Sequence, residues 1–117
     1  MHMSWLTTLY AGRRIHLKEV GYPSSVFTAS SEETQARFVS QLFAAWDQHA
    51  DQIEFVGYFQ LTDFSPSTVD YYVGYYGYDV PIFRAFLGTL GLRTWAGSGS
   101  HKLAWDQFVV EARARGW

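Results

Sequence analysis

The sequence predicts one α/β domain built from two strand–helix units and a C-terminal helix. The chain has 117 residues, of which 48% are hydrophobic, enough for a single domain with a buried core. Two apolar segments, 14–20 and 53–61, have the length and composition of strands. Segments with helical spacing of apolar residues follow them, and this order is typical of parallel strands covered by helices.

Residues 4–11, which precede the first unit, are expected to be the end of a helix, because Gly12 can adopt the left-handed conformation that often ends a helix. A strand over 14–20 follows. Strict alternation places Ile15, Leu17 and Glu19 on one face, and His16, Lys18 and Val20 on the other. Gly21 to Ser25 must then form a loop.

A long helix is predicted after this loop. Ser30 and Glu33 have the spacing of a capping box, which marks a helix N-terminus. One apolar stripe then follows at helical spacing, made of Phe38, Val39, Leu42, Phe43 and Trp46.

The second unit begins with a strand over 53–61 that is apolar on both faces. A tyrosine-rich loop is predicted from about Asp63 to Asp79, and long loops in small domains are usually functional. Asp79 before Pro81 is expected to open a helix that Gly91 closes. After a turn over 97–100, Ser100 is expected to cap the last helix.

Two parallel strands do not make a stable sheet alone, because both are edge strands. We therefore expect either that copies of the chain associate or that the chain is part of a longer protein.

Composition excludes several classes of function. The net charge of −2 and a pI near 6.0 give no basic field for nucleic acid. The chain has no cysteine, and His16, His49 and His101 lie on different predicted elements, so neither a metal nor a cofactor is predicted. No apolar run approaches the ~20 residues of a membrane span, and no signal peptide is recognisable, so we expect a cytoplasmic protein that does not contact a membrane.

Aromatic residues make up 19% of the chain. Tyr and Trp both stack on sugar rings and fill protein interfaces, so composition alone favours neither a carbohydrate site nor an interface.

Several segments resemble the C-terminal part of retaining (β/α)8-barrel glycoside hydrolases, particularly those acting on β-glucans and galactans. The similar stretches are K-E-V-G-Y-P-S-S (18–25), E-x-Q-A-R-F-V (33–39), F-V-G-Y-F-Q-L-x-D (55–63), F-L-G-x-L-G-L-R (86–93) and K-x-A-W-D-x-F (102–108). The resemblance implies a partial barrel: the seventh and eighth strands with their helices, completed by self-association, with a tetramer as the candidate assembly.

The resemblance also implies site residues. Glu19 corresponds to the catalytic nucleophile at the end of the seventh strand, and Tyr58 to an aromatic residue under the bound sugar. Further candidate sugar-binding residues are Tyr22, Asp63, Tyr72, Tyr75 and Tyr76. If Glu19 faces the barrel interior, strict alternation turns His16 and Lys18 toward the helices, where apolar residues are expected.

The segment that carries the acid/base residue in such enzymes is absent. Three functions therefore remain open: a β-glycosidase assembled from several copies, a non-catalytic oligosaccharide-binding protein, and a self-assembling chain without enzymatic activity.

Overall fold

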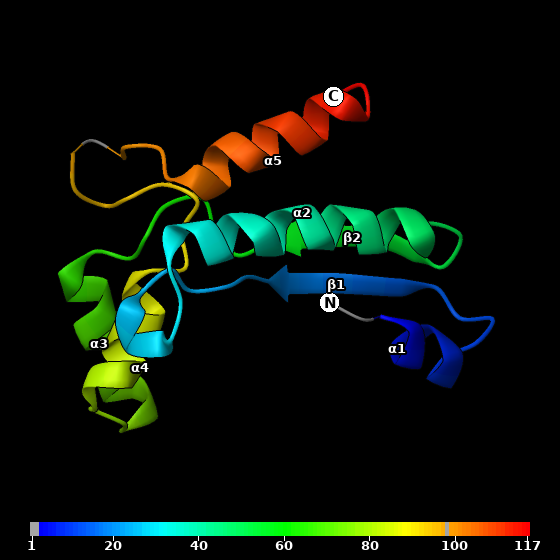
Figure 1. Cartoon of the computed structure of the whole chain (residues 1–117). Helices are drawn as coiled ribbons and strands as arrows, with labels where there is room; N and C mark the ends of the chain where they lie inside the picture. The colour runs from blue at the N-terminus through cyan, green and yellow to red at the C-terminus, as the bar shows by residue number, and fades with distance from the viewer. Residues whose placement is uncertain (1–2, 98) are drawn as a thin grey trace.

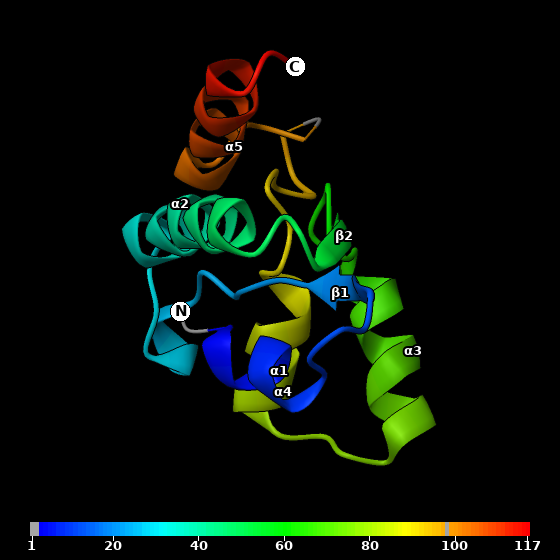
Figure 2. The ribbon, with the colours of Figure 1, turned by 90° about the vertical axis from the view of Figure 1, so that its right-hand side faces the viewer.

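The computed structural model describes residues 3–97 and 99–117, which form five α-helices and a two-stranded parallel sheet (Figures 1 and 2). The elements follow in the order α1 (Ser4–Leu9), β1 (Ile15–Val20), a 3-10 helix (Val26–Thr28), α2 (Glu32–Gln48), β2 (Ile53–Tyr58), α3 (Pro66–Tyr76), α4 (Pro81–Gly88) and α5 (Leu103–Ala114). The α/β class is confirmed. The described residues form an open sheet and no closed barrel.

Helix α2 connects the two strands and covers one face of the sheet (Figure 1). Its apolar stripe is buried as predicted, with Val39, Leu42 and Phe43 at most 3% exposed. The capping prediction was wrong by one residue: Ser31, and not Ser30, accepts a hydrogen bond from the amide of Thr34 (3.1 Å).

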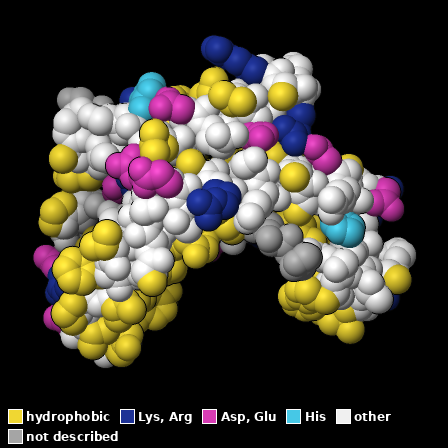
Figure 3. Space-filling model, viewed as in Figure 1, with side chains coloured by type: hydrophobic (Ala, Val, Ile, Leu, Met, Phe, Trp, Pro, Cys, Tyr) yellow, Lys and Arg dark blue, Asp and Glu magenta, His cyan; other side chains and the backbone are white. Residues whose placement is uncertain are grey.

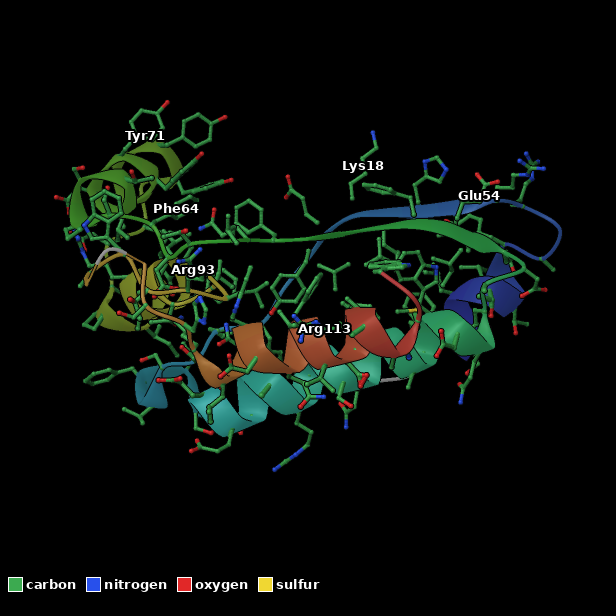
Figure 4. The ribbon with its side chains drawn as sticks, turned by 90° about the horizontal axis from the view of Figure 1, so that it is seen from above. Lys18, Glu54, Phe64, Tyr71, Arg93 and Arg113 are labelled. Atoms are coloured by element: carbon green, nitrogen blue, oxygen red, sulfur yellow. The ribbon has the colours of Figure 1, made fainter. Side chains whose placement is uncertain are left out.

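Helix α5 packs on α2 and completes this side of the molecule (Figure 4). It begins later than predicted, because Lys102 and not Ser100 is its N-cap residue. Ala104 is fully buried against α2, which its small side chain permits. Of the turn predicted over 97–100, Ser98 lies outside the described residues.

A bulge interrupts the alternation of β1. Leu17 pairs with Val56 and Val20 with Tyr58, so Lys18 and Glu19 together lie opposite the single residue Gly57. An extra residue in one strand shifts all later side chains by one position. The strict alternation predicted for β1 is therefore wrong at its end.

The bulge places the apolar and polar side chains of β1 on different faces. Ile15, Leu17 and Val20 all pack into the core that contains α2, whereas His16, Lys18 and Glu19 are exposed. Figure 4 shows Lys18 and Glu54 projecting from the sheet on the side away from α2 and α5. His16 and Lys18 thus do not face the helix layer, contrary to the expectation from alternation.

The strands come unusually close where the bulge lies. A Cβ atom at Gly57 would be 2.4 Å from the carbonyl oxygen of Lys18, and one at Gly21 would be 2.0 Å from that of Phe59. Real Cβ atoms do not approach so closely, so both positions require glycine. The two glycines let the chain leave the sheet at the point where Glu19 emerges.

The tyrosine-rich segment predicted as a long loop is in fact helix α3. The Ser65 hydroxyl accepts a hydrogen bond from the Thr68 amide (3.1 Å), and Pro66 occupies the first turn. Gly77, with φ of 64°, ends the helix in the left-handed conformation. Start and stop signals were thus both present in the sequence.

Packing explains why this segment is helical although tyrosine and valine are modest helix formers. Val69 and Val73 lie one turn apart and are buried together with Leu87 of α4. Helix α4 begins after Val80; Asp79, predicted as its cap, instead pairs with Arg84 (2.6 Å). Helices α3 and α4 form a lobe beyond the C-terminal ends of the strands (Figure 1).

The face of the molecule opposite α5 is hollowed between this α3–α4 lobe and α1. Figure 3 shows hydrophobic side chains gathered over the lobe, next to the hollow. Large exposed apolar side chains of the lobe include Tyr71, Tyr75, Tyr76 and Phe86. Part of the exposed apolar surface of the molecule therefore lies beyond the strand ends, on the lobe next to Glu19.

Candidate functional site

A cleft of about 430 Å³ lies between the ends of the two strands and the α3–α4 lobe. Five aromatic side chains, from the segment after β2 and from α3 and α4, form much of its wall. The lining residues are Glu19, Gly21, Phe59, Phe64, Tyr72, Tyr76, Phe86, Leu87 and Leu90. Among the residues that the structure describes, Glu19 is the only charged side chain that lines this cleft.

Glu19 reaches the cleft because of the bulge, which turns its side chain out of the core. Within the described part of the chain its carboxylate accepts no hydrogen bond and forms no ion pair. Several other carboxylates have a cationic partner; Glu54, for example, binds Arg14 (2.7 Å), and its pKa is lowered by the neighbouring His16 and by Arg14. A carboxylate without a protein partner is available to accept hydrogen bonds from a ligand.

The aromatic wall is held in a fixed arrangement by ring contacts. Phe64 stacks on Tyr72, with centroids 5.2 Å apart, and meets Phe59 edge-on at 5.8 Å. Tyr72 is in turn stacked on Tyr76 at 6.4 Å. Mutually packed rings lose little conformational freedom on binding, which favours a preformed site.

Two of the predicted tyrosines, Tyr72 and Tyr76, thus lie in one cleft with Glu19. Tyr75 does not line it: this side chain is 71% exposed on the outer side of α3 and meets Tyr76 edge-on at 5.0 Å. The helical structure of α3 causes this separation, because successive positions on a helix face different directions.

Tyr58 lies on the other face of the sheet, away from the cleft. It packs between Phe38 of α2 and Phe108 of α5, and its hydroxyl is buried without a hydrogen-bond partner among the described residues. Burial raises the pKa of this hydroxyl above its usual range.

Phe59, the next residue, lines the cleft instead, and sequence reasoning missed it. Strand β2 ends at Tyr58, three residues before the predicted end at Leu61. Strict alternation from the buried Ile53 would place Phe59 on the core face, but the strand register shifts at Glu54. Val56 and Tyr58 therefore share the core face, and Phe59 faces the opposite side.

Asp63 is buried beside the cleft and paired. Lys102 Nζ donates to its Oδ1 (2.7 Å), and so does the Gly91 amide (2.8 Å). Burial raises the pKa of Asp63, while Lys102 and the amide act in the opposite direction. Lys102 Nζ also donates to the Ser24 hydroxyl (3.2 Å), so this pair fixes the loop after β1.

Tyr22 is also separate from the Glu19 cleft. Its ring stacks on Phe38, with centroids 5.0 Å apart, and lines a shallow hollow with Phe83 and Phe86. Its carbonyl oxygen accepts a hydrogen bond from Gln35 Nε2 (2.9 Å). The fully buried Gln35 also donates to the Gly91 carbonyl (3.0 Å) and so ties α2 to two loops.

Within residues 3–97 and 99–117, no three acidic or histidine side chains lie close enough together to hold a metal ion. None of the described helices is both long and apolar enough to cross a membrane.

No family model matches the chain, and neither a curated protein nor a solved structure matches it. The resemblance to retaining glycosidases remains a prediction from the sequence, and the geometry of the Glu19 cleft is the basis for assigning a function.

Proposed function

We propose that the chain binds β-linked carbohydrate in the Glu19 cleft. One observation supports this most directly: an unpaired carboxylate stands in a cleft whose other walls are aromatic and aliphatic. A sugar ring has an apolar C–H face and a rim of hydroxyl groups. Phe59 and Tyr72 offer surfaces for the apolar face, and Glu19 offers acceptors for the hydroxyl groups.

Glu19 also corresponds to the catalytic nucleophile of the retaining glycoside hydrolases that the sequence resembles. It lies at the C-terminal end of a parallel strand, where catalytic side chains of barrel enzymes project. On this proposal the two strands are the seventh and eighth of a (β/α)8 barrel, and the exposed face with Lys18 and Glu54 is the barrel's inner surface. The parallel pairing and the placement of α2 and α5 on one face support this arrangement.

Hydrolysis requires more than the cleft provides. A retaining enzyme needs a second carboxyl group about 5–5.5 Å from the nucleophile. No described residue other than Glu19 supplies a carboxyl group to the cleft. Binding is therefore the function that we propose for one chain, and hydrolysis would need an acid from a second polypeptide.

Self-association is a second candidate function. Within the described residues, β1 and β2 pair only with each other, so both have an unpaired edge. Phe55 adds a large aromatic side chain, 51% exposed, to the open face of the sheet. Bare edges and exposed apolar surface favour pairing with another chain.

Calorimetric titration with β-glucan and β-galactan oligosaccharides tests the carbohydrate proposal. Glu19→Gln removes the charge that strengthens hydrogen bonds to sugar hydroxyls, so we expect about a tenfold loss of affinity. Glu33→Gln is the matched control, because Glu33 is an exposed acid on α2 outside the cleft.

Two results would contradict the proposal: no binding of any oligosaccharide to the unmodified chain, or equal affinities for it and for Glu19→Gln. Release of reducing ends by the unmodified chain and Glu33→Gln, but not by Glu19→Gln, would add hydrolysis to binding.

A further inference from the structure

The outer side of α3 presents a second pair of tyrosines. Tyr71 and Tyr75 lie one helical turn apart and are 65% and 71% exposed. Their ring centroids are 6.5 Å apart and their planes differ by only 21°. Figure 4 shows Tyr71 projecting outward from α3, at the same end of the molecule as Phe64. Tyr71 and Tyr75 are called the outer pair.

The outer pair is continuous with the wall of the Glu19 cleft. Tyr71 meets Tyr72 edge-on at 5.3 Å, and Tyr75 meets Tyr76 in the same way at 5.0 Å. Tyr72 and Tyr76 line the cleft and are themselves stacked, with planes 24° apart. Four tyrosines thus form one surface that runs from inside the cleft to the outside of the helix.

Helix α3 is a firm support for this surface. Its N-terminus is capped by Ser65, and its inner face is fixed by the burial of Val69 and Val73 against α4. The rings therefore need little ordering when a ligand binds.

The charges around the outer pair favour a neutral ligand. Asp70 is the only charged residue of α3, and its carboxylate is bound by Arg84 (2.6 Å). Arg84 is also held by Asp79 (2.6 Å), so this cluster has more negative than positive charge. Nucleic acids and acidic polysaccharides need free cationic groups, which this cluster does not offer.

The size of the cleft bears on ligand length. Pockets of about 300–1,000 Å³ enclose a small molecule, and the cleft measures about 430 Å³. A linear oligosaccharide longer than a few sugar units must therefore leave the cleft. The rings of the outer pair, each with a hydroxyl group at its edge, lie along one path out of the cleft.

We propose that the outer pair extends the Glu19 cleft, and that the ligand is a linear, uncharged β-linked polysaccharide and not a mono- or disaccharide. This inference rests on the proposed carbohydrate function and specifies the substrate class of the same site. Short ligands occupy the cleft alone, whereas longer ones also stack on Tyr71 and Tyr75.

Calorimetric titration with linear β-glucan and β-galactan oligosaccharides, from disaccharide to hexasaccharide, measures how affinity depends on length. Affinity should rise with length in the unmodified chain. The double variant Tyr71→Ala/Tyr75→Ala should bind the longest ligand with about tenfold lower affinity. Its affinity for the shortest ligand should fall by less than about twofold. Tyr10→Ala is the control, because Tyr10 is an exposed tyrosine beside α1, at the other end of the molecule (Figure 1).

The results separate this inference from the proposed function. If oligosaccharides bind but the double variant loses affinity equally at every length, or at none, the outer pair is not an extension of the cleft. If no oligosaccharide binds, the carbohydrate proposal itself fails. Light scattering of the double variant tests whether a second copy of the chain, and not a polysaccharide, contacts the outer pair. A lower mass than that of the unmodified chain would assign the outer pair to self-association and overturn the inference.

Discussion

Buried polar residues hold the loops around the Glu19 cleft. Lys102 and Asp63 are only 4% and 10% exposed at their side chains, and their ion pair joins the start of α5 to the segment after β2. Gln35 acts similarly from α2, by donating to carbonyl groups of two loops. Such groups are costly to bury unless they are paired, so each supports the loop geometry as long as its partner is present.

Lys102→Met should destabilise the fold by about 3–5 kcal/mol, because it leaves the Asp63 carboxylate buried without its cation. The free energy of unfolding from urea titration measures this. Arg13→Met is the control and should change stability by less than about 0.5 kcal/mol, because the side chain of Arg13 is exposed in the turn between α1 and β1.

The effect of pH gives Lys102→Met a second readout. Burial already raises the pKa of Asp63, and loss of the ammonium group raises it further. A carboxyl whose pKa is higher in the folded state binds a proton preferentially there, so acidification should return part of the lost stability. An unfolding free energy within about 0.5 kcal/mol of the unmodified chain at neutral pH would contradict this account.

At the scale of elements, the sequence allowed the prediction of strands and helices where period and length agreed. The stripe of α2 and the apolar character of β2 led to the correct order and to a parallel sheet. Helix α3 was missed because its valine stripe is short and its tyrosines suggested a loop, although Ser65-Pro66 and Gly77 marked its ends. Its formation depends on contact with α4, which a local pattern does not reveal.

The site was predictable in part for the same reason. Glu19 was found from its place at a strand end, but its face depends on the bulge opposite Gly57. Phe59 was missed because the end of β2 was placed three residues too late. The direction of the Glu19 side chain and the place of Phe59 both depend on how β1 and β2 pair, which a local sequence pattern does not reveal.

Gly57→Ala tests the bulge. The added methyl group would meet the Lys18 carbonyl oxygen at 2.4 Å, so the strands must separate, at a cost of about 1–3 kcal/mol. Gly74→Ala is the matched control: no atom lies within 4 Å of its Cβ position in α3, and alanine should stabilise the helix by up to about 1 kcal/mol. Urea unfolding of both variants measures whether the two changes in the free energy of unfolding have opposite signs. Equal changes would show that the close approach of Gly57 to the Lys18 carbonyl group does not require glycine.

At the scale of the whole molecule, the asymmetric covering of the sheet is the main feature. Helices α2 and α5 cover one face, while the other presents His16, Lys18, Glu54 and Phe55. Arg14 and His16 partly neutralise the charge of Glu54. The ring centroids of Phe55 and His16 are 6.1 Å apart. Parallel sheets are normally protected on both faces and along their edges, so this surface is suited to contact with another chain.

We expect the solution mass to increase with concentration from the monomer value of 13.4 kDa, because association covers the open face and the strand edges. Light scattering over a concentration series measures this, and a plateau near four times that mass would support closure of a barrel by four copies. Phe55→Lys places a charge on the open face and should shift the mass toward the monomer. Trp95→Lys is the control, since Trp95 is a similarly exposed aromatic residue in the loop before α5. A mass of 13.4 kDa at every concentration would contradict self-association, and equal masses for the two variants would place the contact elsewhere than on the open sheet.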